Sequence, residues 1–374
     1  MLPINKERLI KQFIQLVQID SESKEELAIA TYLKEIFTSL GLTVLEDNAA
    51  LKTGHQANNL ICTLKGNNHT SETIFFAAHM DTVKPGNNIK PIIDKNFIKS
   101  DGTTILGADD KAAIAVIIEL IHILKEQQIP HGDIQFILTV GEESGLVGAK
   151  AFDTSLIHPS YGYVLDSDGE VGSIVVQAPY QYKILTKIYG KAAHAGIAPE
   201  KGISAINVAA KAISKMKLGR IDEETTANIG YFKGGKQTNI VCDYVEILAE
   251  ARSLKKEKVD SIVNHIKQTF DQYANKYGAT SSIEVNEMYA GYHLQQSEQV
   301  VAIAFQAAEE IGLNPKAIKS GGGSDANIFN SYGIPTVNLA VGYENIHTKK
   351  ERISIQQLIN LTNLVLQIIK NSSK

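Results

Sequence analysis

The feature of this sequence that most constrains its fold is a set of short apolar runs that are continuous rather than alternating. A strand that is apolar at successive positions is buried on both faces, which is typical of a mostly parallel sheet with helices on both sides. The runs cover residues 73–79, 133–140, 161–166 and 335–341. Between the first two runs, Lys111–Lys125 is apolar almost all round and predicts a buried helix. The order strand, helix, strand indicates an α/β fold.

Two further helices are expected outside the middle of the chain. Apolar residues recur at helical spacing from Leu27 to Phe37, and Gly41 is a typical helix stop. Ser23 and Glu26 have the spacing of a capping box, so we expect them to cap the start of this helix. The segment Glu298–Ile311 predicts the other helix.

The middle of the chain has a different pattern. Tyr180–Tyr189 and Val241–Ala251 alternate between apolar and polar residues, as strands with one solvated face do. Helices are expected over Ser204–Lys217 and Val259–Tyr277, with a further strand over Ser282–Tyr289. These elements form a small α+β unit.

The two patterns predict an α/β domain that is interrupted by an inserted domain. Residues 1–178 and 293–374 would form the α/β domain, and residues 179–292 the inserted one. A chain of 374 residues fits two domains of ordinary size.

Composition excludes several classes of protein. The net charge of −4 implies no broad basic surface, so nucleic acid is not an expected partner. The longest apolar stretch, Ala112–Leu124, contains Glu119 and His122 and is shorter than the ~20 residues that span a membrane. The first residues, MLPINKERL, lack the apolar core of a signal peptide.

The two cysteines restrict both the metal chemistry and the compartment. Cys62 and Cys242 lie far apart in the sequence, and neither belongs to a CxxC pair. A zinc–cysteine site is therefore excluded. A reduced, cytoplasmic setting is the expectation.

Polar side chains follow each apolar run. In open α/β sheets, ligands bind beyond the carboxyl ends of the strands, so residues at these ends should converge on one crevice. Two acidic residues at the start of the buried helix join them. The set consists of His79, Asp81, Asp109, Asp110, Glu142, Glu143, Asp166 and His347.

The composition of this set indicates a metal site. So many carboxylates cannot all be ionised in one cleft without cations, and two histidines with carboxylates suit zinc or a similar divalent metal. Two metals that share one carboxylate would each have a histidine and a carboxylate of their own, and one acidic residue would remain as a proton carrier. Each motif alone has an ordinary structural explanation, and the interpretation depends on their occurring together.

The motifs also resemble those of a known family. HMDTV at 79–83, GADDK at 107–111, GEESG at 141–145, LD at 165–166 and IHT at 346–348 are similar, in this order, to the motifs of the M20 metallopeptidases. The resemblance spans nearly the whole chain and is closest to the peptidase T (tripeptidase) branch. It implies a hydrolase with two co-catalytic divalent metals, Zn²⁺ or alternatively Co²⁺ or Mn²⁺, and an inserted lid domain that also forms a homodimer.

The resemblance assigns a role to each metal-site residue. His79 and Asp166 would hold one metal, and Glu143 and His347 the other. The carboxylate of Asp109 would bridge the two metals, and the peptide bond from Asp109 to Asp110 would be cis.

Two further residues would serve the chemistry directly. Glu142 would be the general base for a metal-bridging hydroxide. Asp81 would accept the second ring proton of His79. The substrate implied by the resemblance is a short peptide.

Substrate-binding roles follow from the same resemblance. His194, in GKAAHAG, matches a lid histidine that reaches the partner's active site, and Asn239 and Arg252 match residues that hold a substrate carboxylate in related carboxypeptidases. Gly322 and Gly323 belong to a glycine-rich loop near the metals. That loop departs from the tripeptidase pattern, which usually has an arginine where Gly321 stands.

An amidohydrolase and a binding protein are the alternative functions. An amidohydrolase or carboxypeptidase that acts on N-acyl amino acids would share every catalytic residue, so the sequence does not separate it from a peptidase. A binding protein that had kept the fold and lost the chemistry should lack a ligand or the base, and here all are present. The sequence contains no GxSxG elbow and no P-loop.

Overall fold

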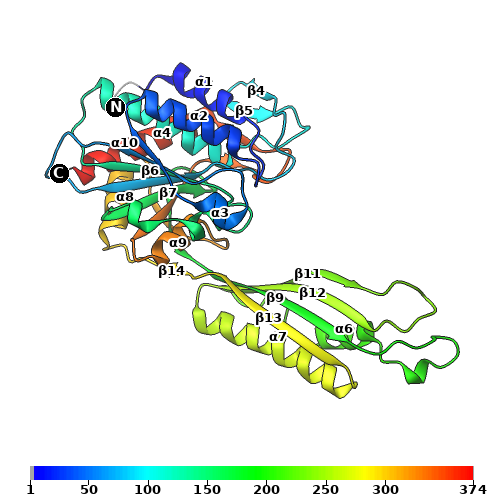
Figure 1. The fold of residues 1–374 in the computed structure, drawn as a ribbon. Helices are drawn as coiled ribbons and strands as arrows, with labels where there is room; N and C mark the ends of the chain where they lie inside the picture. Colours follow the sequence, from blue (N-terminus) through cyan, green and yellow to red (C-terminus); the bar gives the residue numbers. More distant parts are fainter. Residues whose placement is uncertain (1–3, 374) are drawn as a thin grey trace. The chain divides into compact units, whose positions relative to one another are not determined.

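The structure is a computed structural model that describes residues 4–373 (Figure 1). Its Cα positions divide into two compact units. One unit runs to Val176 and also contains His293–Lys319 and the chain from Ser324 onward. The other consists of Gln177–Tyr292 together with Ser320–Gly323. The predicted inserted segment thus lies in the second unit, which gains a short piece of the glycine-rich loop.

The first unit is built on a nine-stranded sheet. Its central strands, β6 (Ile134–Thr139), β3 (Ile74–His79), β7 (Tyr161–Ser167) and β16 (Thr336–Ala340), are parallel neighbours in that order. Further strands extend both edges. On one side, β2 (Leu60–Leu64) pairs antiparallel with β6, and β1 (Thr43–Glu46) pairs antiparallel with β2. On the other side, β8 (Ser173–Ala178) pairs antiparallel with β16, and its other neighbours are β14 (Tyr292–His293) and β15 (Lys316–Lys319).

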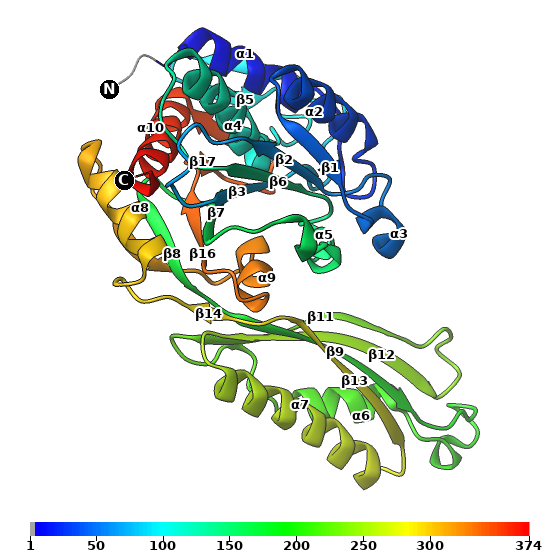
Figure 2. The same ribbon diagram turned by 60° about the vertical axis from the view of Figure 1, so that its left-hand side comes forward.

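Helices cover both faces of this sheet, as Figures 1 and 2 show. Every residue of β3 is buried, and successive side chains point to opposite faces. Phe75 contacts Phe329 on one face, while Phe76 stacks on Phe136 and Tyr163. The helices of this unit are α1 (Lys6–Val17), α2 (Leu27–Ser39), α3 (Ala49–Thr53), α4 (Ala108–Glu126), α5 (Val147–Ala151), α8 (Gln299–Glu310), α9 (Asp325–Ser331) and α10 (Ile355–Ser372). The predicted α/β class is confirmed.

A second, small sheet lies in the same unit. It is four-stranded and antiparallel, in the order β17 (Tyr343–Glu344), β18 (Arg352–Ser354), β5 (Phe97–Ser100) and β4 (Pro91–Asp94). His347 lies in the connection between β17 and β18 of this sheet.

The second unit is an antiparallel sheet with two helices on one face. Its strands run in the order β10 (Gly219–Arg220), β11 (Thr225–Gly234), β12 (Tyr244–Ser253), β9 (Tyr180–Tyr189) and β13 (Thr280–Tyr289). Alternate side chains of β9 and β12 are buried with residues of α6 (Ala205–Ile213) and α7 (Lys256–Lys276) in one core. The period-2 pattern predicted for these strands reflects this one-sided burial.

The expected capping box is wrong. Helix α2 begins at Leu27 with Glu26 as its N-cap residue, and no side chain caps it. The hydroxyl of Ser23 instead donates to Asp81 Oδ2 at 2.6 Å. Both polar side chains of this segment are used elsewhere in the first unit.

Some helices and strands of the structure were not predicted from the sequence. Helices α1 and α10 and the short edge strands were not assigned from the sequence. The first three residues of the N-terminal stretch discussed above lie outside the described residues. Within the part of the chain that the structure describes, none of the helices has both the length and the hydropathy that crossing a bilayer requires.

Candidate active site

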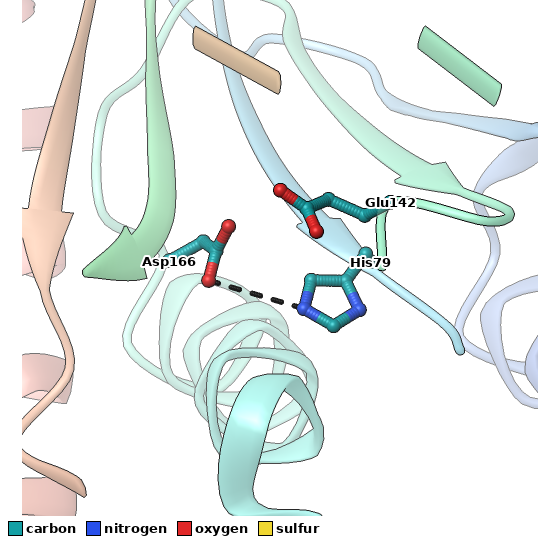
Figure 3. Close-up of side chains that lie close together, drawn as sticks. All are labelled: His79, Glu142 and Asp166. Carbon is teal, nitrogen blue, oxygen red and sulfur yellow. Dashed lines mark ion pairs between the residues drawn. The ribbon is translucent and has the colours of Figure 1, made fainter. Parts of the chain in front are cut away.

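Three strand ends bring predicted polar residues of the first unit together. His79 is the last residue of β3, Asp166 lies near the end of β7, and Glu142 follows β6 by three residues. Figure 3 shows these three side chains pointing toward one another at that edge of the sheet. The prediction that the strand ends converge therefore agrees with the geometry of this unit.

Asp109 lies between the two histidines. Its Oδ1 is 3.0 Å from His79 Nε2, and its Oδ2 is 3.2 Å from His347 Nε2. Each histidine has a second carboxylate beside the same nitrogen. Asp166 Oδ1 is 3.9 Å from His79 Nε2, and Glu143 Oε1 is 2.7 Å from His347 Nε2. The arrangement has two halves that share one carboxylate.

The backbone around Asp109 is held by a residue that the sequence analysis missed. The peptide bond between Asp109 and Asp110 is cis, as the resemblance implies. The buried carboxylate of Glu351 accepts hydrogen bonds from the backbone N–H groups of Leu106, Gly107 and Asp109, at 2.7, 2.8 and 3.1 Å. Glu351 lies in a charged stretch of the sequence and had no pattern by which to find it.

Asp81 fixes the orientation of both His79 and the Glu142–Glu143 backbone. His79 Nδ1 lies 2.9 Å from the carbonyl oxygen of Asp81 and 3.4 Å from its Oδ1. The same carboxylate accepts the backbone N–H groups of Glu142 and Glu143, at 2.9 and 3.3 Å. Asp81 thus contacts the histidine through two of its oxygens rather than its carboxylate alone.

Tyr343 supports the His79 half of the arrangement. Its hydroxyl donates to Asp166 Oδ1 at 3.0 Å, and the side chain is buried. Asn338 exchanges two hydrogen bonds with the backbone of Asp166, one through each end of its amide. Neither residue was identified from the sequence, although Asn338 interrupts an apolar run.

The two histidines differ sharply in exposure. The side chain of His79 is 1% exposed and that of His347 is 48% exposed. Hydrogen bonds with Asp109 and Glu143 raise the pKa of His347 to about 10. Burial would lower the pKa of His79, but hydrogen bonds with Asp109 and Asp81 outweigh it, and the pKa lies well above its usual value. The carboxylates therefore favour positive charge at both ring positions.

The carboxyl groups divide into two kinds. Burial acts to raise the pKa of Asp109, but hydrogen bonds with His347 and His79 bring it below the usual range. Burial, and then the charge of Asp166, raise the pKa of Glu142 well above its usual value. Burial and Asp109 do the same for Asp166. A site that holds a charged carboxylate beside a carboxyl with a raised pKa suits proton transfer.

The donor set fits divalent metals. Ligand atoms of His79, Asp109 and Glu143 lie within 4.8 Å of one another, and so do those of His79, Glu142 and Asp166. Imidazole nitrogens and carboxylate oxygens are the ligands that zinc and its neighbours accept. Distance alone makes Glu142 a ligand candidate as well as a base candidate.

The second unit separates its predicted residues. Ala195 donates its N–H to the carbonyl oxygen of Asn239, and His194 and Ile240 form a β-bridge, so His194 and Asn239 are neighbours. Both side chains are exposed. Arg252 is instead near the far end of β12, eight positions from Tyr244.

The length of the strand gives the separation between these two places. At ~3.3 Å per residue, eight residues span about 26 Å. Asn239, which precedes Tyr244 in the sequence, and Arg252 therefore lie at opposite ends of β12.

Arg252 lies beside the glycine-rich loop. Its Nε and Nη2 donate to the carboxylate of Glu250 at 3.0 and 3.2 Å, and its Nη1 lies 3.4 Å from the carbonyl oxygen of Gly321. Gly323 has a packing reason to be glycine, because a Cβ there would lie 2.3 Å from the ring of Tyr289. The neighbouring Gly322 donates its N–H to Ser320 Oγ at 3.0 Å.

Comparison with known proteins identifies the relatives of this chain. The sequence model of peptidase family M20/M25/M40 matches residues 75–371. The uncharacterized protein YqjE of Bacillus subtilis is 57% identical over 371 residues, which cover 99% of this chain and 100% of YqjE.

Two solved structures are also similar over almost the whole length. One is described as aminopeptidase PepT from Bacillus cereus, with a TM-score of 0.93 and 57% identity, covering 99% of this chain and 100% of that one. The other is described as a tripeptidase from Staphylococcus aureus, with a TM-score of 0.96 and 50% identity, covering 99% of both chains. With the family match and these relatives, the chain belongs to peptidase family M20/M25/M40.

Proposed function

We propose that this protein is a di-metal peptidase that releases amino acids from short peptides. The observation that carries the proposal is the Asp109 carboxylate, whose two oxygens each face the Nε2 atom of a different histidine. A carboxylate that faces two imidazoles, each flanked by another carboxylate, supports a pair of divalent cations with one shared ligand.

In this proposal, His79 and Asp166 would hold one metal and Glu143 and His347 the other, with Asp109 shared. Zinc is the proposed native metal, with cobalt or manganese as substitutes. Divalent metals bound there would polarise the scissile carbonyl and lower the pKa of water.

The chain's own residues would orient the groups and move the proton. Asp81 holds the ring of His79 and the backbone of Glu142 through separate oxygens. Glu142 would take a proton from the attacking water and return it to the leaving amine. Its raised pKa supports this role, because a general base works best when its pKa is near the working pH.

The substrate would be a short peptide with a free carboxylate, held by Arg252. Glu250 takes the Nε hydrogen and one Nη2 hydrogen of Arg252, so the substrate carboxylate would bind the edge formed by Nη1 and Nη2. The solved relatives are described as an aminopeptidase and a tripeptidase. Tripeptidases usually have an arginine where this chain has Gly321, which has no side chain to select substrates by length. Di- and tripeptides should therefore both be cleaved.

We further propose a homodimer in which His194 and Asn239 serve the partner's site. The separation of these residues from Arg252 along β12 supports a second copy, because one chain does not bring them to one small substrate.

Both cysteines are free thiols, which supports a reducing, cytoplasmic compartment.

The test is hydrolysis of di- and tripeptides beside N-acyl amino acids, before and after chelation. Activity on peptides should disappear with a chelator and return with zinc, cobalt or manganese. Full activity in protein that elemental analysis shows to be free of divalent metal would contradict the proposal. Cleavage of N-acyl amino acids alone would reassign the substrate and leave the metal chemistry in place.

A further inference from the structure

Three side chains outside the metal-ligand set form a hydrogen-bonded row that ends on the loop carrying Glu142 and Glu143. His55 Nδ1 lies 2.6 Å from Glu26 Oε1, and His55 Nε2 lies 3.3 Å from Ser144 Oγ. The side chains of Glu26 and His55 are 0% and 2% exposed, whereas Ser144 is exposed. The row therefore runs from the interior to the rim of the site.

The partner of Nδ1 places one ring proton of His55. A carboxylate only accepts, so Nδ1 carries the proton that it donates to Glu26. Nε2 lies beside the Ser144 hydroxyl, which itself donates to the carbonyl oxygen of Gly141 at 3.2 Å. Glu26 Oε1 also accepts the backbone N–H of Lys24 at 3.0 Å. The ring is thus held by a carboxylate that is itself fixed to the chain.

His55 also contacts the backbone at the start of the loop. A Cβ on Gly141 would lie 2.4 Å from His55 Cε1, so the ring packs directly on the glycine. Gly141 has φ +58°, which glycine adopts without strain. The imidazole touches the loop at Gly141 and at Ser144, on either side of the two glutamates.

A second connection joins the same loop to the segment before α2. The Ser23 hydroxyl donates to Asp81 Oδ2, and the Asp81 carboxylate accepts the backbone N–H groups of Glu142 and Glu143. Ser23 and Glu26, three residues apart, therefore hold the loop through Asp81 and through His55. The two side chains that resemble a capping box in the sequence share this task.

A glutamate–histidine–serine row could instead serve a serine nucleophile. Such a nucleophile needs backbone N–H groups for the oxyanion, above all that of the following residue. Here the N–H groups of Gly145 and Leu146 both donate to the carbonyl oxygen of Glu142, at 2.9 and 2.8 Å. Those donors are already used, so the geometry favours a positioning role.

We propose that Glu26 and His55 are positioning residues that fix the carboxylates of Glu142 and Glu143 through Gly141 and Ser144. The inference rests on the proposed function, in which these two glutamates are the base and a ligand. Small displacements of such groups are costly, because a shift of about 1 Å at a reacting centre can reduce the rate ~10²-fold.

The test is a double-mutant cycle between Ser144 and His55, measured on a tripeptide with the metal-loaded protein. Ser144→Ala should lower kcat roughly tenfold with KM within about twofold of wild type, and His55→Gln should lower it ~10–100-fold. The loss in the double variant should be smaller than the product of the two single losses, because the hydroxyl and the ring contact each other and hold the same loop at Gly141. Ser144→Thr keeps a hydroxyl and should restore most of kcat.

The matched control is Ser155→Ala. Ser155 is another exposed serine of the same unit, whose hydroxyl donates to Asp153 at 2.6 Å, and its loss should leave kcat unchanged. The visible spectrum of the cobalt-loaded protein gives a readout besides turnover, because it reports ligand geometry. Ser144→Ala should shift that spectrum, and Ser155→Ala should not.

Several results would overturn the inference. Wild-type kcat and an unchanged cobalt spectrum in Ser144→Ala would do so, even if His55→Gln failed to fold. Independent, multiplying effects of the two substitutions would also contradict it. A wild-type protein that neither binds cobalt nor cleaves peptides would overturn the proposed function itself, which distinguishes the two failures.

Discussion

The two units arrange their chemical residues in opposite ways. In the first unit, residues separated by up to 268 positions, from His79 to His347, meet around one carboxylate. In the second, His194 and Asn239 lie at one end of the sheet and Arg252 lies near the other. Strand direction explains the difference. Parallel strands put all their carboxyl ends at one edge, whereas antiparallel strands alternate.

This difference has a functional consequence. A parallel sheet can assemble a metal site within one chain, because every strand end contributes at the same edge. If His194, Asn239 and Arg252 bind substrate as proposed, the two ends of the antiparallel sheet would serve two places, which in a symmetric dimer would belong to two active sites.

The largest effect should come from the glutamate pair of the first unit. Glu142→Gln should keep its metal and lose ~10²–10⁴-fold in kcat, because general-base help disappears. Glu143→Gln should lose metal as well, since Glu143 Oε1 faces His347 across 2.7 Å. Elemental analysis and kcat on a tripeptide measure both.

The control for this pair is Glu309→Gln, on the exposed side of α8. It should change neither metal content nor rate. Loss of metal in Glu142→Gln with retention in Glu143→Gln would reverse the two roles, which the cluster of Glu142 with His79 and Asp166 makes a real alternative.

The same contrast explains how far the sequence could predict this molecule. The apolar runs and the polar residues after them predicted the central sheet and the convergence of its strand ends, since both follow from burial and strand direction. The pairing of Asp109 with two histidines needed the resemblance, because spacing alone does not say which carboxylate is shared. Glu351 and Tyr343 could not be predicted from the sequence, because a hydrogen bond that supports a site does not require residues to recur at regular spacing.

Ser23 and Glu26 show a different limit. Their spacing fits a capping box, but tertiary contacts with Asp81 and His55 take both side chains. A local pattern does not reveal which distant partner competes for a hydroxyl or a carboxylate. The separation of His194 from Arg252 in the second unit could not be predicted either, because the motifs around these residues do not indicate the direction of the strands.

The next effect in size concerns the second unit and His194. If its ring N–H stabilises the partner's developing oxyanion, His194→Ala should lower kcat by ~10²–10³-fold, the usual result of losing one such donor, with metal content unchanged. Mixing His194→Ala with Glu142→Ala by refolding should then restore activity. A random mixture of symmetric dimers would have about a quarter of its sites whole. Demonstrably mixed dimers that stay inactive would show that the histidine acts within its own chain.

A smaller effect is expected at the other end of the same sheet. Arg252→Lys should lower kcat/KM for a free peptide ~10–100-fold, because one charge-assisted hydrogen bond of the fork is lost. A peptide with an amidated terminus should be a poor substrate of wild type, and the substitution should hardly change its rate. Arg220→Lys, at an exposed arginine of β10, is the control. Equal losses on both peptides would assign Arg252 a structural role instead.

The smallest effect is the number of protons released when metal binds to the first unit, and it tests the role of His347. Hydrogen bonds with Asp109 and Glu143 raise the pKa of His347 to about 10, so at neutral pH the ring is protonated before metal binds. A metal ligand must be deprotonated, so binding at this histidine releases one proton and the affinity should rise up to about tenfold per pH unit below pH 10. Above that pH the dependence should flatten.

Calorimetric titration of zinc in buffers of different ionisation enthalpy counts the protons released. His347→Gln should release one proton fewer than wild type at pH 7, whereas His158→Gln, at an exposed histidine of the same unit, should release the same number. An unchanged count in His347→Gln would mean that the ring gives up no proton to the metal. The cluster would then be held by the buried His79 half alone, and the sharing of Asp109 between two cations would be wrong.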